Sequence, residues 1–117
     1  MRIAVGNVID GVVESIGQVT SDLLNPATEA VVGAATLSRL DEVDRAMDAA
    51  ARAFEGWRRT TPRERQERLF HLADLIEANT ERIADAEVLL TGKPRQATIT
   101  HEILRAVDNI RFFAGAL

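Results

Sequence analysis

The sequence predicts an α+β fold, in which short N-terminal β-hairpins precede about four α-helices. Turn-forming residues separate short apolar runs in the first third of the chain, and apolar residues recur at helical spacing after Ser38. Capping residues mark the boundaries of the later helices. We therefore expect N-terminal strands and hairpins over residues 1–37 and a helical segment over residues 38–117, which together form one incomplete domain.

Two β-hairpins are expected in the first part. Asp10-Gly11 is a favoured two-residue turn and lies between Asn7–Ile9 and Val12–Glu14. A second hairpin would pair residues 19–24 with residues 30–35 around an Asn-Pro turn, because proline sets φ and asparagine favours turn initiation.

The first helix is expected to begin after Ser38, which would be its N-cap, and to end at Gly56. Trp57 would follow directly and anchor the turn to the next helix, with a ligand-stacking role as the alternative. One face of this helix carries apolar side chains, namely Leu40, Val43, Met47, Ala50, Ala51 and Phe54.

The second helix is expected to begin at Thr61, where Pro62 takes the first helical position and Glu64 completes a capping box. Its predicted buried stripe is Leu69, Leu72, Ala73 and Ile76. A third helix is expected over Thr80–Thr91, with Gly92 as a left-handed C-cap and Pro94 beyond it.

The last helix, over residues 97–114, is apolar on two sides. Leu104 and Phe112 project from one side, and the other side carries Ile99, Ile103, Ala106, Val107, Ile110 and Phe113. Because helices of this kind are normally buried between layers, we expect a covering portion that this chain does not supply. The alternative is two ordinary exposed apolar side chains.

Composition excludes several functions. The net charge is −4, from 14 basic and 18 acidic residues, so no basic stripe favours nucleic acid. Apolar runs are too short for a membrane span or a signal-peptide core, and a cytoplasmic location is expected. The chain has no cysteine, which excludes disulfides, thiolate zinc sites and cysteine nucleophiles within it.

The remaining candidates for chemistry are weak. No glycine-rich phosphate loop is present, so direct nucleotide binding is not expected. His71 and His101 have no metal-ligand spacing and are expected to be structural or solvated. The same holds for acidic residues interleaved with arginines on helix faces, which are Glu77, Glu81, Asp85 and Glu102. The sequence therefore predicts no catalytic, cofactor-binding or metal-ligating residue in this chain.

Several segments nevertheless resemble one family. Asn25–Gly33, followed by a helix that ends Ala53–Trp57, resembles the start of the NAD(P)-dependent aldehyde dehydrogenases. Further segments agree in order from about Val8 to Leu117, at Ile9–Gly11, Val13–Ser15, Pro62–Ile76, Thr91–Pro94 and Val107–Gly115. Thr60-Thr61-Pro62 and the ending Arg111–Ala116 look most similar to the aminobutyraldehyde dehydrogenase branch, which oxidises aldehydes derived from polyamines.

The resemblance implies an N-terminal portion of an oxidoreductase. The family's catalytic cysteine, general-base glutamate, oxyanion-hole asparagine and cofactor loops all lie downstream of the matched segment. Family members form a thiohemiacetal on that cysteine and pass hydride to NAD or NADP, so this chain is expected to be inactive alone and to hold no cofactor. Its expected partner is the remainder of an aldehyde dehydrogenase, or another chain bound through the last helix. The alternative is a non-catalytic helical interaction module or a subunit of a split dehydrogenase.

Two positions carry further implications. Many relatives have an acidic residue before the Thr/Asn-Gly-Lys-Pro turn, where it helps to hold a monovalent cation, but this chain has Leu90 there. Because leucine offers no oxygen ligand, we do not expect that cation site. Lys93 is expected to act as an electrostatic cap on the preceding helix rather than as a catalytic base.

Overall fold

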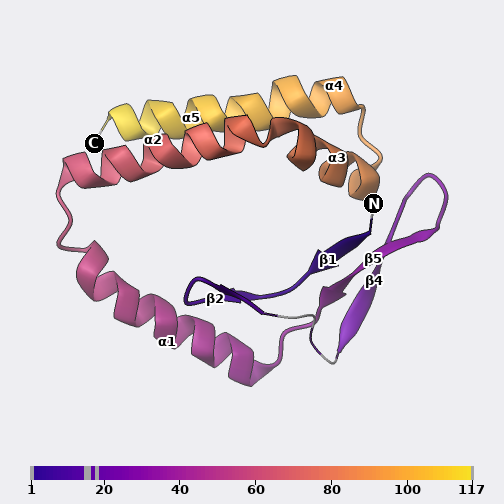
Figure 1. The fold of residues 1–117 in the computed structure, drawn as a ribbon, viewed down its shortest axis with the longest axis horizontal. Coiled ribbons are helices and arrows are strands. Elements are labelled where there is room, and N and C mark those ends of the chain that lie inside the picture. The colour runs from indigo at the N-terminus through magenta and orange to yellow at the C-terminus, as the bar shows by residue number, and fades with distance from the viewer. Residues whose placement is uncertain (1, 15–16, 18, 117) are drawn as a thin grey trace. The chain divides into compact units, whose positions relative to one another are not determined.

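The computed structural model describes residues 2–14, 17 and 19–116. The chain divides into two compact units, Met1–Arg59 and Thr60–Leu117. Among the described residues, the strands and the first helix belong to the first unit and the other helices to the second (Figure 1). The predicted α+β class is confirmed. Ser15 and Leu117, which belong to the family resemblance, lie outside the described residues.

The first unit contains a three-stranded sheet with the order β1-β5-β4. The central strand β5 (Val31–Thr36) pairs parallel with β1 (Ile3–Val5) and antiparallel with β4 (Thr20–Leu24). The β4–β5 pair is the predicted second hairpin, and its strand bounds lie within one residue of those expected. Strand β1 was not predicted, because a three-residue strand carries almost no periodic signal.

Gly33 permits the close pairing of β1 with β5. It lies opposite Ile3 in the parallel register. A Cβ atom at Gly33 would stand 2.0 Å from the backbone oxygen of Ile3, which is far inside van der Waals contact. Glycine is therefore required here for the approach of two backbones.

The predicted first hairpin is also confirmed. Strand β2 (Val8–Ile9) pairs antiparallel with β3 (Val12–Val13) through the two-residue loop Asp10-Gly11. Both loop residues have positive φ, 54° at Asp10 and 76° at Gly11, as a type I′ turn requires. The backbone N–H of Glu14 donates to the carbonyl of Asn7 at 2.9 Å and closes the open end of the hairpin.

Helix α1 (Leu40–Trp57) differs from its predicted bounds at both ends. Arg39 and not Ser38 is the N-cap, because the Ser38 hydroxyl donates to the Asn7 side chain at 2.8 Å. The Glu42 carboxylate instead accepts the backbone N–H of Arg39 at 2.7 Å. Gly56 does not end the helix, since it lacks a positive φ and the chain remains helical through Trp57. Trp57 is therefore the last helical residue and not the first residue of the turn.

The apolar face of α1 is exposed. Leu40 is 83% exposed, and the other large side chains of the predicted face, Val43, Met47 and Phe54, are each close to half exposed or more. The one buried residue of the helix is Ala49. The amphipathic pattern is therefore present, but the large apolar side chains of this face stay largely exposed.

The second unit begins with two helices whose boundaries agree with the sequence. In α2 (Pro62–Ala78), the Thr61 hydroxyl accepts the backbone N–H of Glu64, and the Glu64 carboxylate accepts that of Thr61. Helix α3 (Thr80–Thr91) ends at Gly92, whose φ is 72°. Within the predicted buried stripe of α2, Ala73 is buried, but Leu72 is 45% exposed, so its prediction as buried was wrong.

The last helical stretch runs continuously through three elements, α4 (Arg95–Ala97), the π-helix η1 (Thr98–Ile103) and α5 (Leu104–Gly115). Helix α5 lies along α2 (Figure 1). The π-helical turn brings Thr98 and Ile103, five residues apart in sequence, into the buried set of this stretch.

The buried positions of α5 only partly follow the apolar side read from the sequence. These buried positions are Val107 and Ala114. The predictions that Phe113 and Ala106 lie on the buried side were therefore wrong, because both are exposed. Leu104 is half-buried and does not project from an exposed side, whereas Phe112 is exposed as predicted.

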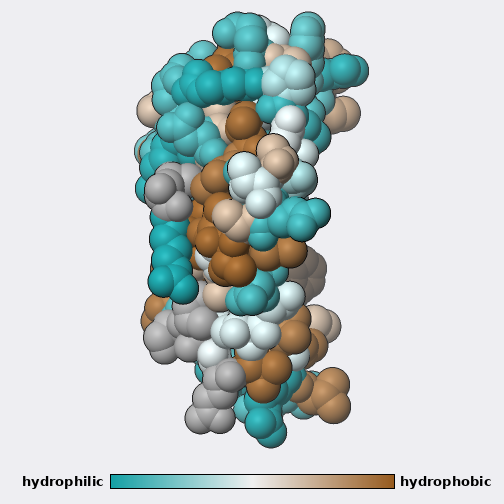
Figure 2. All heavy atoms as spheres, turned by 90° about the vertical axis from the view of Figure 1, so that its right-hand side faces the viewer, coloured by the Kyte–Doolittle hydropathy of each residue, from teal (hydrophilic) through white to brown (hydrophobic). Residues whose placement is uncertain are grey.

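The buried core of the described residues is small. Its members are Ala49, Ala73, Ala84, Thr98, Ile103, Val107 and Ala114. Many large apolar side chains stay exposed, and hydrophobic atoms reach the surface on the face drawn in Figure 2. Among the described residues, no helix is both long enough and apolar enough to cross a membrane.

Candidate functional site

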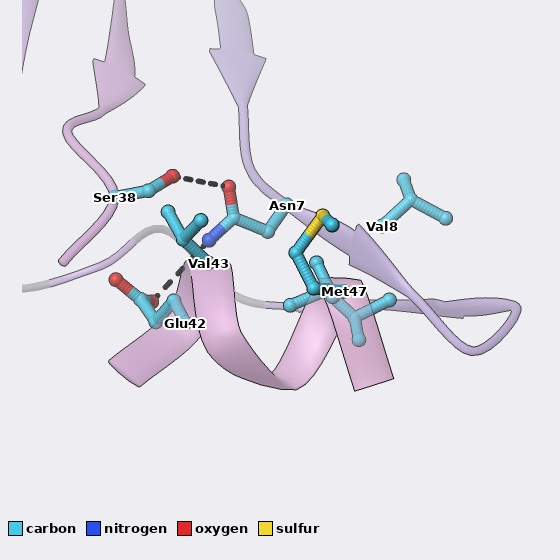
Figure 3. Close-up of a pocket in the computed structure, with 8 residues that line it drawn as sticks. Asn7, Val8, Ser38, Glu42, Val43 and Met47 are labelled. Carbon is cyan, nitrogen blue, oxygen red and sulfur yellow. Dashed lines mark hydrogen bonds between the residues drawn. The ribbon is translucent and has the colours of Figure 1, made fainter. Parts of the chain in front are cut away.

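One hollow of the first unit lies between the β2–β3 hairpin and α1. It encloses about 200 Å³ and is lined on its apolar side by Val8, Ile9, Val43, Ala46 and Met47 (Figure 3). Its polar side is formed by Asn7, Ser38 and Glu42, which come from the segment before β2, the β5–α1 connection and the first turn of α1.

The polar groups of this pocket bond to one another. The Asn7 side chain accepts from the Ser38 hydroxyl at 2.8 Å and donates to Glu42 Oε1 at 3.3 Å (Figure 3). The second oxygen of Glu42 accepts the N–H of Arg39. No buried side-chain polar atom of the described residues lacks a partner.

A second hollow, of about 350 Å³, lies beside the first and is charged. Arg45 Nη1 lies 2.7 Å from Glu14 Oε1, and Arg52 Nη2 lies 3.4 Å from Asp10 Oδ2. The hydrogen bond and charge of Glu14 raise the pKa of Arg45 above its ordinary value. Both arginines are therefore paired with acidic residues of the hairpin segment.

The second unit carries its charges in bridges around the turn after α3. Lys93 Nζ lies 3.0 Å from Glu102 Oε2 and 3.3 Å from Glu87 Oε1. Hydrogen bonds to these two carboxylates, with Glu102 contributing most, raise the pKa of Lys93. Its amine therefore stays protonated and is unsuited to act as a base. Arg95 pairs with Glu81 and Asp85 in the same way.

Arg111 of α5 bridges to α2. Its Nη2 lies 2.7 Å from both Glu77 Oε2 and Asp74 Oδ1, and these contacts raise its pKa. The four carboxylates that the sequence assigned to solvated helix faces, Glu77, Glu81, Asp85 and Glu102, thus all pair with cations in the structure. They serve to join helices.

The structure does not bring the histidines into a site. His71 and His101 are both exposed, the first on α2 and the second on η1. Among residues 2–14, 17 and 19–116, no group of three His, Cys, Asp or Glu side chains is arranged to hold a metal ion. Leu90 is half-buried in α3.

The sequence analysis missed the contacts between the hairpin and α1. A signal for them was present, since Arg45 and Arg52 are two helical turns apart on one face of α1. Asp10 in the hairpin loop and Glu14 after β3 carry the opposite charge. Thr98 was missed as well. It is fully buried, and its hydroxyl donates to the carbonyl of Pro94 at 3.2 Å.

Comparison with known proteins defines the class. Residues 13–117 match the aldehyde dehydrogenase family, and the chain belongs to that family. It is 46% identical over 92 residues to a probable aldehyde dehydrogenase of Streptomyces coelicolor, which covers 79% of this chain and 17% of the relative. It is 40% identical over 96 residues to the 2-aminomuconic semialdehyde dehydrogenase of Bos taurus, and this match covers 82% of this chain and 20% of the relative.

Solved structures agree. The NAD⁺ complex of an aldehyde dehydrogenase from Bacillus cereus superposes with a TM-score of 0.89 at 36% identity, covering 97% of this chain and 24% of that one. The chain therefore spans about a quarter or less of the length of these relatives.

The β5–α1 connection lacks the features of a phosphate-binding turn. The β5–α1 connection leads from a strand into a helix, but it contains no glycine that would let a pyrophosphate approach. The first turn of α1 holds Asp41 and Glu42, and Glu42 already bonds the N–H of Arg39. Two carboxylates at this helix terminus would repel a phosphate.

Proposed function

We propose that this chain is the N-terminal structural portion of an enzyme that oxidises aldehydes to carboxylic acids with NAD⁺ or NADP⁺, and that it has no such activity alone. The observation that carries the proposal is the likeness to the Bacillus cereus enzyme, at a TM-score of 0.89 over 97% of this chain and 24% of that one. The described residues would then contribute a scaffold and leave the chemistry to other parts of the enzyme.

The side chains support this division of labour. The chain has no cysteine, so it offers no thiol to attack an aldehyde. Its two histidines are exposed and lie on different elements. Its charged groups are paired across the hairpin and between helices. An arrangement of this kind holds elements together.

An interaction module is the second candidate. The observation that favours it is the pair Phe112 and Phe113, which are 72% and 67% exposed and meet edge to face at 5.4 Å. Exposed aromatic side chains are frequent anchors of protein interfaces. In this case the partner would be the remainder of a dehydrogenase or another chain. The aminobutyraldehyde branch, a cytoplasmic location and the absence of nucleic-acid binding stay predictions.

The proposal is tested with the purified chain. We expect no aldehyde-dependent formation of NADH or NADPH across short, long and amino-substituted aldehydes, and no saturable heat of NAD⁺ binding in calorimetric titration. The Bacillus cereus enzyme is the positive control for both measurements. Turnover that stays with the chain through repeated purification would refute the proposal, as would saturable NAD⁺ binding.

A further inference from the structure

The β2–β3 hairpin gains little stability from its own strands. Each strand is two residues long, and two-stranded hairpins of this size are marginal in water. The valines of the hairpin, Val8, Val12 and Val13, are all more than half exposed, so they bury little apolar area. The hollow of about 200 Å³ beneath the hairpin leaves part of its apolar contact with α1 unmade.

Polar contacts hold the hairpin to α1 instead. Arg45 and Glu14 form the shortest of them at 2.7 Å, and the Glu14 side chain is only 23% exposed, so solvent screens this pair less than an ordinary surface pair. Arg52 and Asp10 are 3.4 Å apart and each about two thirds exposed or more, which makes this pair weak. At the other end of the hairpin, the Asn7 side chain donates to Glu42 at 3.3 Å and accepts from the Ser38 hydroxyl, just before α1, at 2.8 Å.

We propose that the β2–β3 hairpin is a strap that the Arg45–Glu14 ion pair fastens to α1, and that it detaches as a unit when this pair is broken or screened. Detachment opens the apolar pocket lined by Val43, Ala46 and Met47 while the β1-β5-β4 sheet stays folded. The inference rests on the local contacts of the first unit and is independent of the proposed function.

The test is amide hydrogen exchange of the full chain, read at two positions in the same unit. The N–H of Glu14 bonds to Asn7 within the hairpin at 2.9 Å, and the N–H of Asn25 bonds to Ala30 in the β4–β5 turn at 2.9 Å. In Arg45→Gln, exchange at Glu14 should rise by roughly three- to tenfold, the range typical of a lost hydrogen bond to a charged group after solvent screening, while Asn25 stays unchanged. Added salt should raise Glu14 exchange in the wild type and have little effect in the variant.

Two further variants keep the result interpretable. Arg63→Gln is the matched control, because Arg63 forms a comparable 2.9 Å pair with Glu67 on α2, and it should change neither amide. The charge exchange Arg45→Glu with Glu14→Arg should restore protection at the residue 14 amide. Unchanged exchange in Arg45→Gln would overturn the proposal. An equal rise at Asn25 would also overturn it, because the hairpin would then open only with the whole unit.

Discussion

The contrast between Val107 and Phe112 in α5 gives the sharpest stability prediction. Val107 is 1% exposed, and Val107→Ala removes two methyl groups from a closed site. The free energy of unfolding should fall by about 2 kcal/mol, because the methyl groups lose their burial and leave a cavity, while the better helix propensity of alanine offsets a small part of the loss. Phe112 is 72% exposed, so Phe112→Ser gives up only about a quarter of a buried ring, or roughly 0.7 kcal/mol.

The stability losses of both variants can be measured by urea unfolding, monitored by far-ultraviolet circular dichroism. With a slope near 2 kcal/mol per molar urea, the midpoint should fall by about 1 M in Val107→Ala and by about 0.3 M in Phe112→Ser. Ile103, 7% exposed, serves as a second buried control, and Leu104→Ser should fall between the two because Leu104 is half-buried. A Phe112→Ser variant as unstable as Val107→Ala would refute the account, because it would mean that this chain covers the Phe112 ring itself.

Two further predictions concern the backbone and pH. Gly33→Ala should unpair β1 from β5, seen as loss of amide protection in Ile3–Val5, because its Cβ would lie 2.0 Å from the Ile3 oxygen; a protected β1 in the variant would contradict this. The pKa of Glu64 is lowered mainly by the hydrogen bond from the Thr61 backbone N–H, and also by the bond from the Thr61 hydroxyl. The stability that this carboxylate gives α2 is therefore present above the pKa of Glu64 in the unfolded chain. It is lost as the pH falls through the pKa of Glu64 in the folded chain. Amide protection at the start of α2, taken from the exchange rate relative to the intrinsic rate at the same pH, should therefore fall at acid pH in the wild type and vary less with pH in Glu64→Gln. Identical protection profiles in the two proteins would argue against the capping role.

Local signals predicted the parts of the fold that depend on neighbouring residues. Asp10-Gly11 and Gly92 each have the positive φ that their positions in the sequence require. Thr61 and Glu64 form the expected capping box, because both partners lie within one turn.

Predictions failed where distant contacts compete with local ones. Ser38 is a good N-cap by type, but its hydroxyl bonds to Asn7, 31 residues away, and the helix begins later. In α5, Phe113 is exposed whereas the neighbouring Ala114 is buried, so the apolar character of a side chain did not by itself identify the buried positions. The contacts of Arg45 with Glu14 were missed because they join segments 31 residues apart.

The central claim is that this chain supplies scaffold and no chemistry to an aldehyde dehydrogenase. A segment exchange tests it most directly, with the matched 24% of the Bacillus cereus enzyme replaced by this chain and aldehyde-dependent NADH formation measured. We predict that the chimera turns over aldehyde while this chain alone does not. A chimera that folds and binds NAD⁺ but has no turnover would contradict the claim, because the replaced segment would then carry part of the chemistry.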